Sequence, residues 1–438
     1  MTLVPRGFII SAPASGSGKT MLAIGLIAAL RKRGIRVVVA KTGPDYIDSQ
    51  FLSAAAGCHC LNLDPWAMSE NELKARVIKH TARADLLVIE GVMGLFDSPV
   101  NCNGSTADLA TLLNLPVVLA VDSSRQAQSI AAIVHGFTTF RASPKVCGII
   151  ATNVASNRHA NIVNKSLAEF NLLHLGSFRT DPSLKLDSRH LGLVQAQEVK
   201  KLHKMIQSAS INAEKGIDLD RIIALASPLP VNASLKGIVQ VVPPLGQYIA
   251  VAHDVAFSFA YPHILLDWQA QGAQIAPFSP LKNESPVAEA DAIFLPGGYP
   301  ELYAAQLSTS HIFLNGIQQA AERGTTIYGE CGGYMVLGQV LIDSNGSTHK
   351  MAGLLSHSTS FAERKLQLGY RLLENAGYAW QLPQRLRGHE FHYSVLAEVG
   401  SDPPLFHATD SCGYELGNYG GHRNTVMGSY AHIISVYQ

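Results

Sequence analysis

The chain has 438 residues, of which 47% are hydrophobic and 15% are charged. This length and composition predict a globular protein with two ordinary α/β domains, each with its own hydrophobic core. The 34 basic and 33 acidic residues give a formal net charge of +1. No overall field therefore favours binding to nucleic acid or to an anionic membrane surface.

The sequence also indicates the cellular compartment in which the protein is expected. The longest early apolar run, residues 21–30, is about half the length that a membrane span requires, and no secretory leader pattern precedes it. The six cysteines are spread along the chain without a C-x-x-C pair, which is typical of reduced thiols. We therefore expect a cytoplasmic protein. Cys58, His59 and Cys60 are too closely spaced for an ordinary zinc site, which favours a structural role.

The first half of the chain alternates short apolar runs with longer helical patterns. Continuous runs of β-branched residues indicate strands buried on both faces of a mostly parallel sheet. A stretch rich in proline and glycine at 231–246 predicts a linker between a first domain at 1–230 and a second at 247–438. The same alternation resumes beyond the linker, so both domains are expected to be α/β.

The segment SAPASGSGKT, residues 11–20, is a loop of small residues between a predicted strand and a predicted helix. This is the context of a P-loop, whose backbone N–H groups and helix N-terminus bind nucleotide phosphates. Lys19 would neutralise phosphate charge and the Thr20 hydroxyl could ligate magnesium. Pro13 stands where the commonest pattern has glycine, and a plain glycine-rich turn is the alternative interpretation.

Two acidic segments follow predicted strands: KTGPDYID, residues 41–48, and IEGVMGLFD, residues 89–97. The carboxyl ends of parallel strands meet at one edge of a sheet, and carboxylates are ligands that magnesium accepts. Glu90 directly follows an apolar run, and a nearby cation would offset the cost of burying its charge. Asp48 and Asp97 could equally be helix caps or turn residues.

In the second half, TTIYGECGGYMVLG, residues 325–338, runs from an apolar strand into glycines that flank Cys331. This G-x-C-x-G pattern is typical of a nucleophile elbow, in which the N–H after the nucleophile helps to bind an oxyanion. A second oxyanion donor could come from Gly297 or Gly298. The alternative is a buried cysteine that acts as a small hydrophobic residue.

A cysteine nucleophile needs a base, because its ordinary pKa of about 8.5 leaves it mostly protonated near neutral pH. Histidine is the expected partner. Three histidines in short polar motifs are candidates, namely His389, His392 and His432. The spacing along the chain does not choose between them, and each could instead be a hydrogen-bonded core residue.

The motifs together resemble the cobyrinic acid a,c-diamide synthases and their homologues that act on hydrogenobyrinic acid. The resemblance covers essentially the whole chain. KTGPDYID and EGVMGLFD are far more specific to this family than the P-loop, which many unrelated NTPases share. The segments that carry the resemblance are, in chain order, SAPASGSGKT, KTGPDYID, NLDPW, IEGVMGLFD, GSTADLA, LPGGYPEL, YGECGGY, GHEFHYS and GSYAH.

The resemblance implies a P-loop NTPase domain similar to dethiobiotin synthetase, followed by a triad-type glutamine amidotransferase domain. The implied activity is that of an ATP- and glutamine-dependent ligase. It amidates the a and c carboxylates of cobyrinic or hydrogenobyrinic acid in cobalamin biosynthesis, with magnesium as cofactor. The reaction passes through an acyl phosphate, and glutamine supplies the ammonia.

The resemblance also assigns roles to residues. Those implied to bind ATP phosphates are Ser15, Gly16, Ser17, Gly18, Lys19 and Thr20. Magnesium would be surrounded by Thr20, Asp45 and Glu90, and the substrate would be positioned by Asp48 and Asp97. Cys331 would be the glutamine nucleophile and His432 its base, with oxyanion donors at Gly298 and Gly332. Many triad amidotransferases have glutamate two residues after the histidine, where this chain has Ile434, so the third triad member is absent or supplied from elsewhere.

Two other functions stay open: an amidotransferase that acts on another tetrapyrrole, and a non-enzymatic P-loop switch with a glutamine-binding domain. The second function is that of a partitioning ATPase. Such ATPases usually carry a lysine early in the phosphate loop, and this chain has Ala14 there, which counts against that function. The expected partners are small molecules, namely the corrin polycarboxylate, L-glutamine and ATP, without nucleic acid or membrane. A homodimer is one assembly to be tested.

Overall fold

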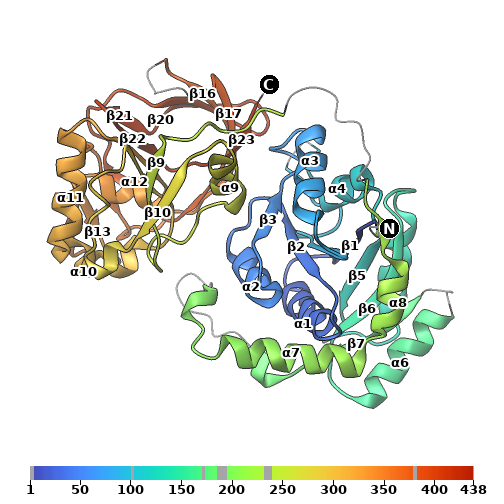
Figure 1. The fold of residues 1–438 in the computed structure, drawn as a ribbon. Coiled ribbons are helices and arrows are strands. Elements are labelled where there is room, and N and C mark those ends of the chain that lie inside the picture. The colour runs from blue at the N-terminus through green and yellow to red at the C-terminus, as the bar shows by residue number, and fades with distance from the viewer. Residues whose placement is uncertain are drawn as a thin grey trace. The chain divides into compact units, whose positions relative to one another are not determined.

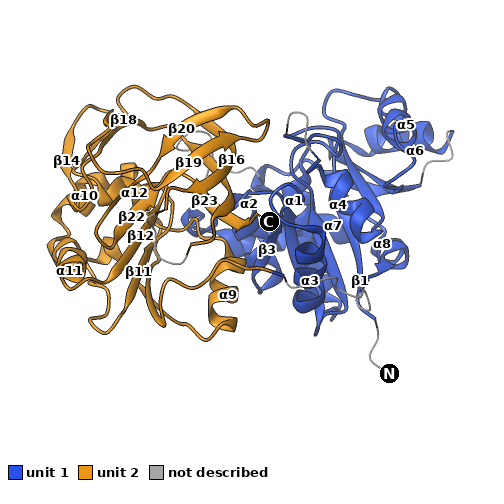
Figure 2. Cartoon of the chain, turned by 90° about the horizontal axis from the view of Figure 1, so that it is seen from above, with its two compact units in different colours: residues 1–239 blue, residues 240–438 orange. Residues whose placement is uncertain are grey.

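The structure, a computed structural model, describes residues 4–99, 103–169, 173–184, 195–230, 239–377 and 382–437. The chain divides into two compact units, residues 1–239 and 240–438 (Figure 2). Residues 231–238, half of the linker predicted at 231–246, lie outside the described residues, so the linker stays a prediction. No described helix has both the length and the apolar character needed to cross a membrane.

Unit 1 is built around one mostly parallel sheet with the described strand order β3-β2-β4-β1-β5-β6-β7; β8 is added antiparallel to β1. The predicted apolar runs form its central strands, which are buried because helices flank the sheet (Figure 1). The strands are β1 (Arg6–Ser11), β2 (Val37–Thr42), β3 (Cys60–Leu63), β4 (Leu86–Glu90), β5 (Val117–Asp122), β6 (Val146–Val154), β7 (His174–Arg179) and β8 (Ser227–Pro228).

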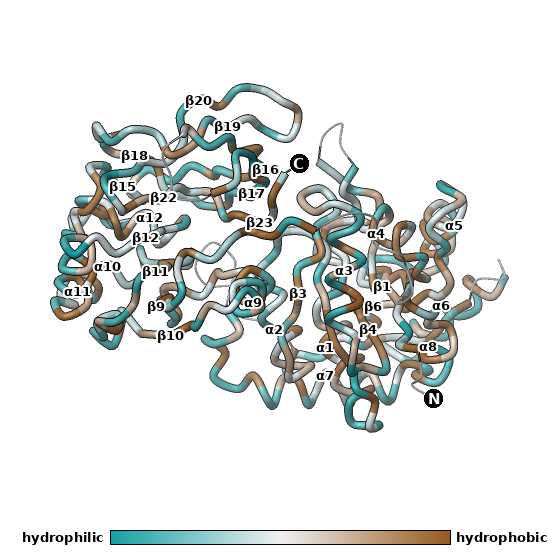
Figure 3. Tube along the Cα trace, turned by 45° about the horizontal axis from the view of Figure 1, so that its top comes forward, coloured by the Kyte–Doolittle hydropathy of each residue, from teal (hydrophilic) through white to brown (hydrophobic). Residues whose placement is uncertain are grey.

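The helices of unit 1 pack along this sheet, and α1 and α7 lie side by side (Figure 1). Hydrophobic stretches run along the strands at the centre of the unit (Figure 3). This is the pattern expected of a sheet that is covered on its faces. The helices are α1 (Lys19–Lys32), α2 (Ile47–Ala56), α3 (Glu70–Thr81), α4 (Thr106–Leu113), α5 (Ile130–Thr139), α6 (Asn157–Ala168), α7 (Leu202–Gly216) and α8 (Leu219–Leu225).

Unit 2 contains a second sheet with the described strand order β10-β9-β11-β12-β22-β21, parallel except for the last pair. Its strands are β9 (Tyr248–Ala252), β10 (Gln274–Phe278), β11 (Ala292–Leu295), β12 (Thr326–Glu330), β21 (Gly421–Arg423) and β22 (Val426–Ser429). The helices are α9 (Pro262–Ala270), α10 (Ala304–Thr309), α11 (His311–Glu322) and α12 (Gly332–Leu337). Both units are therefore α/β, as predicted.

Two smaller sheets complete unit 2. One has the order β14-β13-β15-β18, and the other is an antiparallel sheet with the order β20-β19-β16-β17-β23. The chain passes from the large sheet to the antiparallel one between β22 and β23. The remaining strands are β13 (Val340–Ile342), β14 (Thr348–Lys350), β15 (Ser358–Ser360), β16 (Gln367–Asn375), β17 (Arg385–His392), β18 (Val395–Glu398), β19 (Phe406–Asp410), β20 (Glu415–Tyr419) and β23 (His432–Val436).

Candidate active sites

The predicted phosphate loop connects β1 to α1. Gly16 and Gly18 have φ angles of 77° and 78°, a left-handed conformation that glycine adopts at little cost. Helix α1 begins at Lys19, so its first N–H groups face the loop. The Lys19 ammonium is buried and donates hydrogen bonds to the carbonyls of Ala14 (3.1 Å) and Met93 (2.7 Å). Burial lowers the pKa of Lys19.

Beside the loop, the structure brings together three of the predicted polar residues. The Thr20 hydroxyl lies 2.8 Å from Glu90 Oε1 and 3.1 Å from Asp48 Oδ2. The parallel pairing of β1, β2 and β4 explains this proximity, since the three strands end at the same edge of the sheet. The loop that follows β1, the acid that closes β4 and the acidic turn after β2 therefore converge.

At the centre of this cluster is Lys41, a residue to which the sequence analysis gave no role. Its side chain is 2% exposed, and its Nζ lies 2.7 Å from Asp48 Oδ2 and 3.1 Å from Glu90 Oε1. Asp45 Oδ2 is 3.6 Å away. The sequence held one signal for this arrangement, a lysine at the end of an apolar strand directly before two aspartates.

The cluster tunes the charges of its members. Burial lowers the pKa of Lys41, but the carboxylates of Asp48, Glu90 and Asp45 outweigh this effect and raise the pKa well above its ordinary value. Burial and the neighbouring Asp48 raise the pKa of Asp45 to about 7. Burial tends to raise the pKa of Asp48 too, but its contact with Lys41 prevails and lowers it. Burial raises the pKa of Glu90.

Two predicted site residues also have local structural contacts. Asp45 Oδ1 accepts hydrogen bonds from the backbone N–H groups of Ile47 (2.9 Å) and Asp48 (3.1 Å), at the start of α2. Asp97 Oδ2 accepts one from Gly94 N–H (2.8 Å). Asp97 thus makes the kind of turn contact that was its alternative interpretation, and Asp45 makes similar contacts while it also faces Lys41.

The oxygen atoms of this cluster suit a hard cation such as magnesium, but they do not surround one position on all sides. Glu90 Oε2 is buried and, in the part of the chain that the structure describes, accepts no hydrogen bond. A buried carboxylate oxygen of this kind, next to a threonine hydroxyl, is compatible with magnesium, which prefers oxygen ligands and usually keeps several waters. The described residues contain no cluster of three acidic, histidine or cysteine side chains arranged around a single ion.

In unit 2, Cys331 lies on the sharp turn between β12 and α12. Its φ and ψ angles are 47° and −104°, a strained conformation for a residue with a side chain and the one that a nucleophile elbow requires. Its N–H donates to the carbonyl of Ser429 at 2.8 Å. Burial, reinforced by the charges of Glu301 and Glu390, raises the pKa of the thiol, so thiolate formation depends on a base.

The glycines around Cys331 are required by close packing. A Cβ on Gly332 would lie 3.0 Å from Gly298 N, and a Cβ on Gly298 would lie 2.0 Å from the carbonyl oxygen of Ala256. The two predicted oxyanion donors, Gly298 and Gly332, are therefore neighbours in the fold. The motif that follows β11 meets the elbow that follows β12 because these strands are parallel partners.

The structure places His432 beside Cys331. A Cβ on Gly297 would lie 2.8 Å from His432 Nε2 and 3.2 Å from Cys331 Cβ, so the two side chains border the same glycine. Strands β12 and β22 are parallel neighbours, with Glu330 opposite Ser429. Cys331 comes one residue after Glu330, and His432 comes three residues after Ser429. The strand pairing therefore explains how two positions far apart in the sequence meet.

The other two candidate histidines have different surroundings. His392 Nε2 lies 2.7 Å from Glu390 Oε1, and Glu390 also forms a buried ion pair with Arg371 at 2.6 Å. His389 is the cross-strand neighbour of His432, and burial, followed by the nearby His432, lowers its pKa to about 3. His392 thus belongs to a separate polar network, and His389 is held neutral.

Sequence comparisons place both units in known families. Residues 8–194 match the CobQ/CobB/MinD/ParA nucleotide binding domain, and residues 248–436 match the CobB/CobQ-like glutamine amidotransferase domain. The hydrogenobyrinate a,c-diamide synthases of Brucella anthropi and Brucella abortus are each 48% identical to this chain, over 98% of both sequences. The chain belongs to the hydrogenobyrinate a,c-diamide synthase family.

More distant family members match over the same extent. The hydrogenobyrinate a,c-diamide synthase of Rhizobium meliloti is 44% identical over 98% of this chain and 99% of its own length. Among solved structures, a glutamine amidotransferase from Thermotoga maritima covers 42% of this chain and 75% of its own, at 17% identity and a TM-score of 0.29. The family assignment therefore rests on the full-length relatives and on the two domain matches.

Proposed function

We propose that this protein is an ATP- and glutamine-dependent ligase that converts the a and c side-chain carboxylates of hydrogenobyrinic or cobyrinic acid into amides. The observation that carries the proposal is the presence of two complementary sites in one chain. Unit 1 has a phosphate loop beside the carboxylates of Asp48 and Glu90, the second of them buried. In unit 2, a strained cysteine and a buried histidine border the same glycine.

In unit 1, the first step forms a bond between a substrate carboxylate oxygen and the γ-phosphorus of ATP, and ADP leaves. The carboxylate must lose its negative charge before an amine can attack it, and the resulting acyl phosphate also provides a good leaving group. The loop N–H groups, Lys19 and Lys41 would hold the phosphates and stabilise the charge that develops during transfer. Ammonia then attacks the acyl carbon, and inorganic phosphate departs.

When bound, magnesium would supply Lewis-acid stabilisation of the charge that develops during phosphoryl transfer. Thr20, Asp45 and Glu90 would hold the ion, and Asp48 and Asp97 would position the reacting carboxylate. Because Lys41 forms ion pairs with the same carboxylates, we expect the lysine and the metal to share this acidic cluster.

In unit 2, Cys331 Sγ attacks the side-chain amide carbon of glutamine while its proton passes to His432. The tetrahedral oxyanion would be held by N–H groups of Gly298 and Gly332. His432 then returns the proton to the leaving nitrogen, the C–N bond breaks and ammonia is released. Water hydrolyses the remaining thioester, which yields glutamate and the free thiol.

The test is to incubate the full chain with ATP, magnesium and glutamine together with either hydrogenobyrinic or cobyrinic acid. We expect two successive amidations, each lowering the product mass by about one unit because NH₂ replaces OH. ADP and glutamate should appear in step with the amides. Amidation of neither corrin, with turnover of another tetrapyrrole, would overturn the substrate assignment, and absence of glutamate release would overturn the amidotransferase assignment.

A further inference from the structure

The base of the glutaminase site, His432, has a carboxylate on its far side. The Glu330 Oε2 atom lies 3.6 Å from His432 Nδ1. Both side chains are buried, with exposed fractions of 7% and 0%. Among the described residues, Glu330 supplies the one carboxylate recorded as an ion-pair partner of this histidine. The position two residues after His432, where many triad amidotransferases carry glutamate, holds the buried side chain of Ile434.

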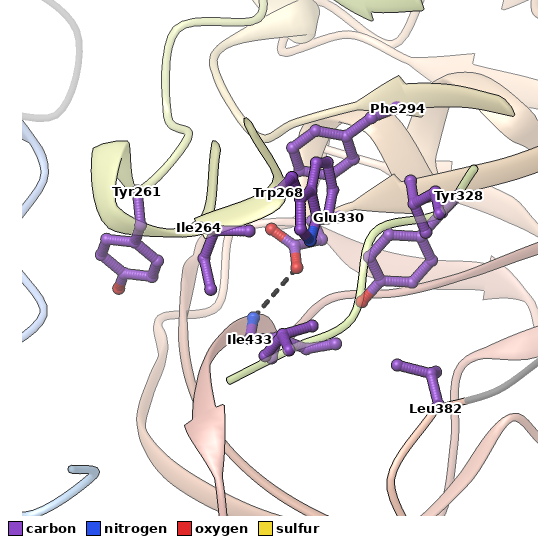
Figure 4. Close-up of a pocket in the computed structure, with 10 residues that line it drawn as sticks. Tyr261, Ile264, Trp268, Phe294, Tyr328, Glu330, Leu382 and Ile433 are labelled. Carbon is purple, nitrogen blue, oxygen red and sulfur yellow. Dashed lines mark hydrogen bonds between the residues drawn. The ribbon is translucent and has the colours of Figure 1, made fainter. Parts of the chain in front are cut away.

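Glu330 is held in place by the segment that carries the histidine. Its Oε1 accepts a hydrogen bond from the backbone N–H of Ile433 at 3.0 Å. Figure 4 shows this bond and the carboxylate next to a mostly apolar cavity, with Trp268 and Tyr328 among the residues that line it. One carboxylate oxygen therefore binds the residue after the histidine, while the other faces the imidazole.

The geometry gives the two ring nitrogens separate tasks. Nδ1 faces Glu330, and Nε2 lies on the side of Gly297 that also borders Cys331. A base must present one nitrogen to the nucleophile, and a group that accepts a hydrogen bond from the N–H of the other nitrogen fixes both the tautomer and the ring orientation. Glu330 occupies that second position.

The charges of two further buried carboxylates, Glu301 and Glu390, reach Cys331, and that of Glu390 is already engaged in other ion pairs. Glu390 forms ion pairs with Arg371 at 2.6 Å and with His392 at 2.7 Å. Among the described residues, the groups around His432 include Glu330 from β12, Cys331 from the turn, His389 from β17 and the ring of Tyr261 before α9. Of these, Glu330 alone can carry a negative charge next to Nδ1.

We propose that Glu330, the residue directly before the nucleophile, is the third member of the glutaminase triad and positions His432 for proton transfer. The inference rests on the proposed glutaminase function of unit 2. The separation of 3.6 Å is longer than a hydrogen bond, and such contacts tighten when substrate binds. As His432 takes the thiol proton, the adjacent Glu330 side chain would stabilise the positive charge that develops on the imidazole.

The decisive variant is Glu330→Gln, because its amide oxygen can still accept the Ile433 N–H while the negative charge is lost. We expect the kcat of glutamine hydrolysis to fall about 10- to 100-fold, the size typical of losing a group that orients a reacting ligand or base. The KM for glutamine should stay within about twofold. Glu330→Asp, which keeps the charge, should recover part of the rate. Glu374→Gln removes an exposed carboxylate on β16 and is the matched control.

A second measurement reports on ionisation of the Cys331 thiol, which the base assists. The rate at which iodoacetamide alkylates Cys331, with Cys412 replaced by serine to remove an exposed competing thiol, should require a higher pH in Glu330→Gln than in the parent chain. Circular dichroism and the thermal midpoint report whether the variant is folded. An unchanged kcat together with an unchanged alkylation profile in a folded variant would overturn the proposal and leave Glu330 as a backbone anchor.

The outcomes separate this inference from the function on which it rests. If the parent chain hydrolyses no glutamine, the amidotransferase function fails, and the alkylation profile still tests whether Glu330 acts on His432. If the parent chain is active and Glu330→Gln changes the KM alone, the triad assignment fails while the amidotransferase function stands. Synthesis fed by ammonium salt should be the same in both proteins, because that route bypasses the thiol.

Discussion

The two candidate sites reach reactivity by opposite means. In unit 1, the cluster of Lys41, Asp48 and Glu90 pairs opposite charges at 2.7 and 3.1 Å. In unit 2, the structure around Cys331 is shaped by backbone geometry, with a positive φ angle and glycines that leave no room for a Cβ. Phosphoryl transfer is mainly a problem of charge, whereas acyl transfer needs a nucleophile held at one angle.

This difference has a consequence for mutation. Removing a charge from the first site leaves its partners buried without compensation, which is costly. Adding a single methyl group to the second site disrupts it without any change in charge.

The broadest effect is expected for Lys19→Ala and Glu90→Gln, which should impair synthesis from both nitrogen sources. Each should lower amide formation at least about 100-fold with either glutamine or ammonia as nitrogen source, because both residues act on carboxylate activation. Product mass and ADP release measure the loss. The controls are Lys74→Ala and Glu70→Gln, which remove members of a surface pair at 3.4 Å. Normal turnover in either site variant would contradict the phosphoryl-transfer role of unit 1.

Cys331→Ser should abolish synthesis from glutamine but not synthesis from ammonia. Glutamine-dependent synthesis should fall about 1,000-fold or more, as it does when a nucleophile is removed from a comparable triad. Synthesis from ammonium salt at slightly alkaline pH should persist, since the activation step does not use this sulfur. Cys412→Ser, at an exposed position, is the control. Full glutamine-dependent activity in Cys331→Ser would show that the elbow is structural.

His432→Ala should also lose glutamine-dependent synthesis, but it should retain more residual activity than Cys331→Ser. A cysteine is intrinsically nucleophilic, and a few per cent of an ordinary thiol is ionised at pH 7 without a base. We therefore expect a residual glutaminase rate that rises with pH. Parallel assays with glutamine and ammonia give the measurement, and a residual rate no higher than that of Cys331→Ser would contradict this view of the base.

Gly297→Ala tests the geometric side of the comparison. The added Cβ would lie 2.3 Å from His432 Cε1, so the imidazole or the loop must move. A displacement of about 1 Å can cost about 100-fold in rate, and we expect a loss of that order in glutamine hydrolysis with ammonia-fed synthesis intact. Gly136→Ala, in α5 with open space around the added atom, is the control. An unchanged glutaminase rate would mean that Gly297 does not set the approach of His432 to Cys331.

The smallest effect concerns pH and stability. Burial lowers the pKa of His389 to about 3, against about 6.5 in an unfolded chain. As the pH falls below about 6.5, the unfolded chain binds a proton that the folded chain does not, so stability is lost progressively towards pH 3. At pH 5 the resulting loss in the free energy of unfolding is about 2 kcal/mol.

His389→Phe should therefore lose less stability than the parent chain between pH 7.5 and pH 5 in urea unfolding. The readout is the difference between the two pH values rather than the stability at either one, since the substitution also alters packing. His203→Phe, at an exposed position on α7, should behave like the parent. An equal pH dependence in His389→Phe would show that His389 takes up a proton in the folded state.

The sequence by itself determined the class of the fold and the identity of the motifs. Continuous apolar runs such as those of β4 and β5 indicated covered parallel strands, and the structure confirms the α/β organisation of both units. The G-K-T and G-x-C-x-G patterns are local, since their chemistry depends on a few consecutive residues and on the turn that these form. Patterns of this kind can be recognised without knowledge of the rest of the chain.

What only the tertiary structure decided is how distant segments meet. Spacing along the chain left three histidines open, and only the family resemblance favoured His432, because strand pairing and burial set the surroundings of each. Parallel pairing of β12 with β22 brings His432 to Cys331, whereas Glu390 engages His392. Lys41 and Glu330 escaped notice for the same reason. A lysine that ends a strand, or a glutamate before a cysteine, acquires its role from the charges that other strands place around it, and a linear pattern does not contain those contacts.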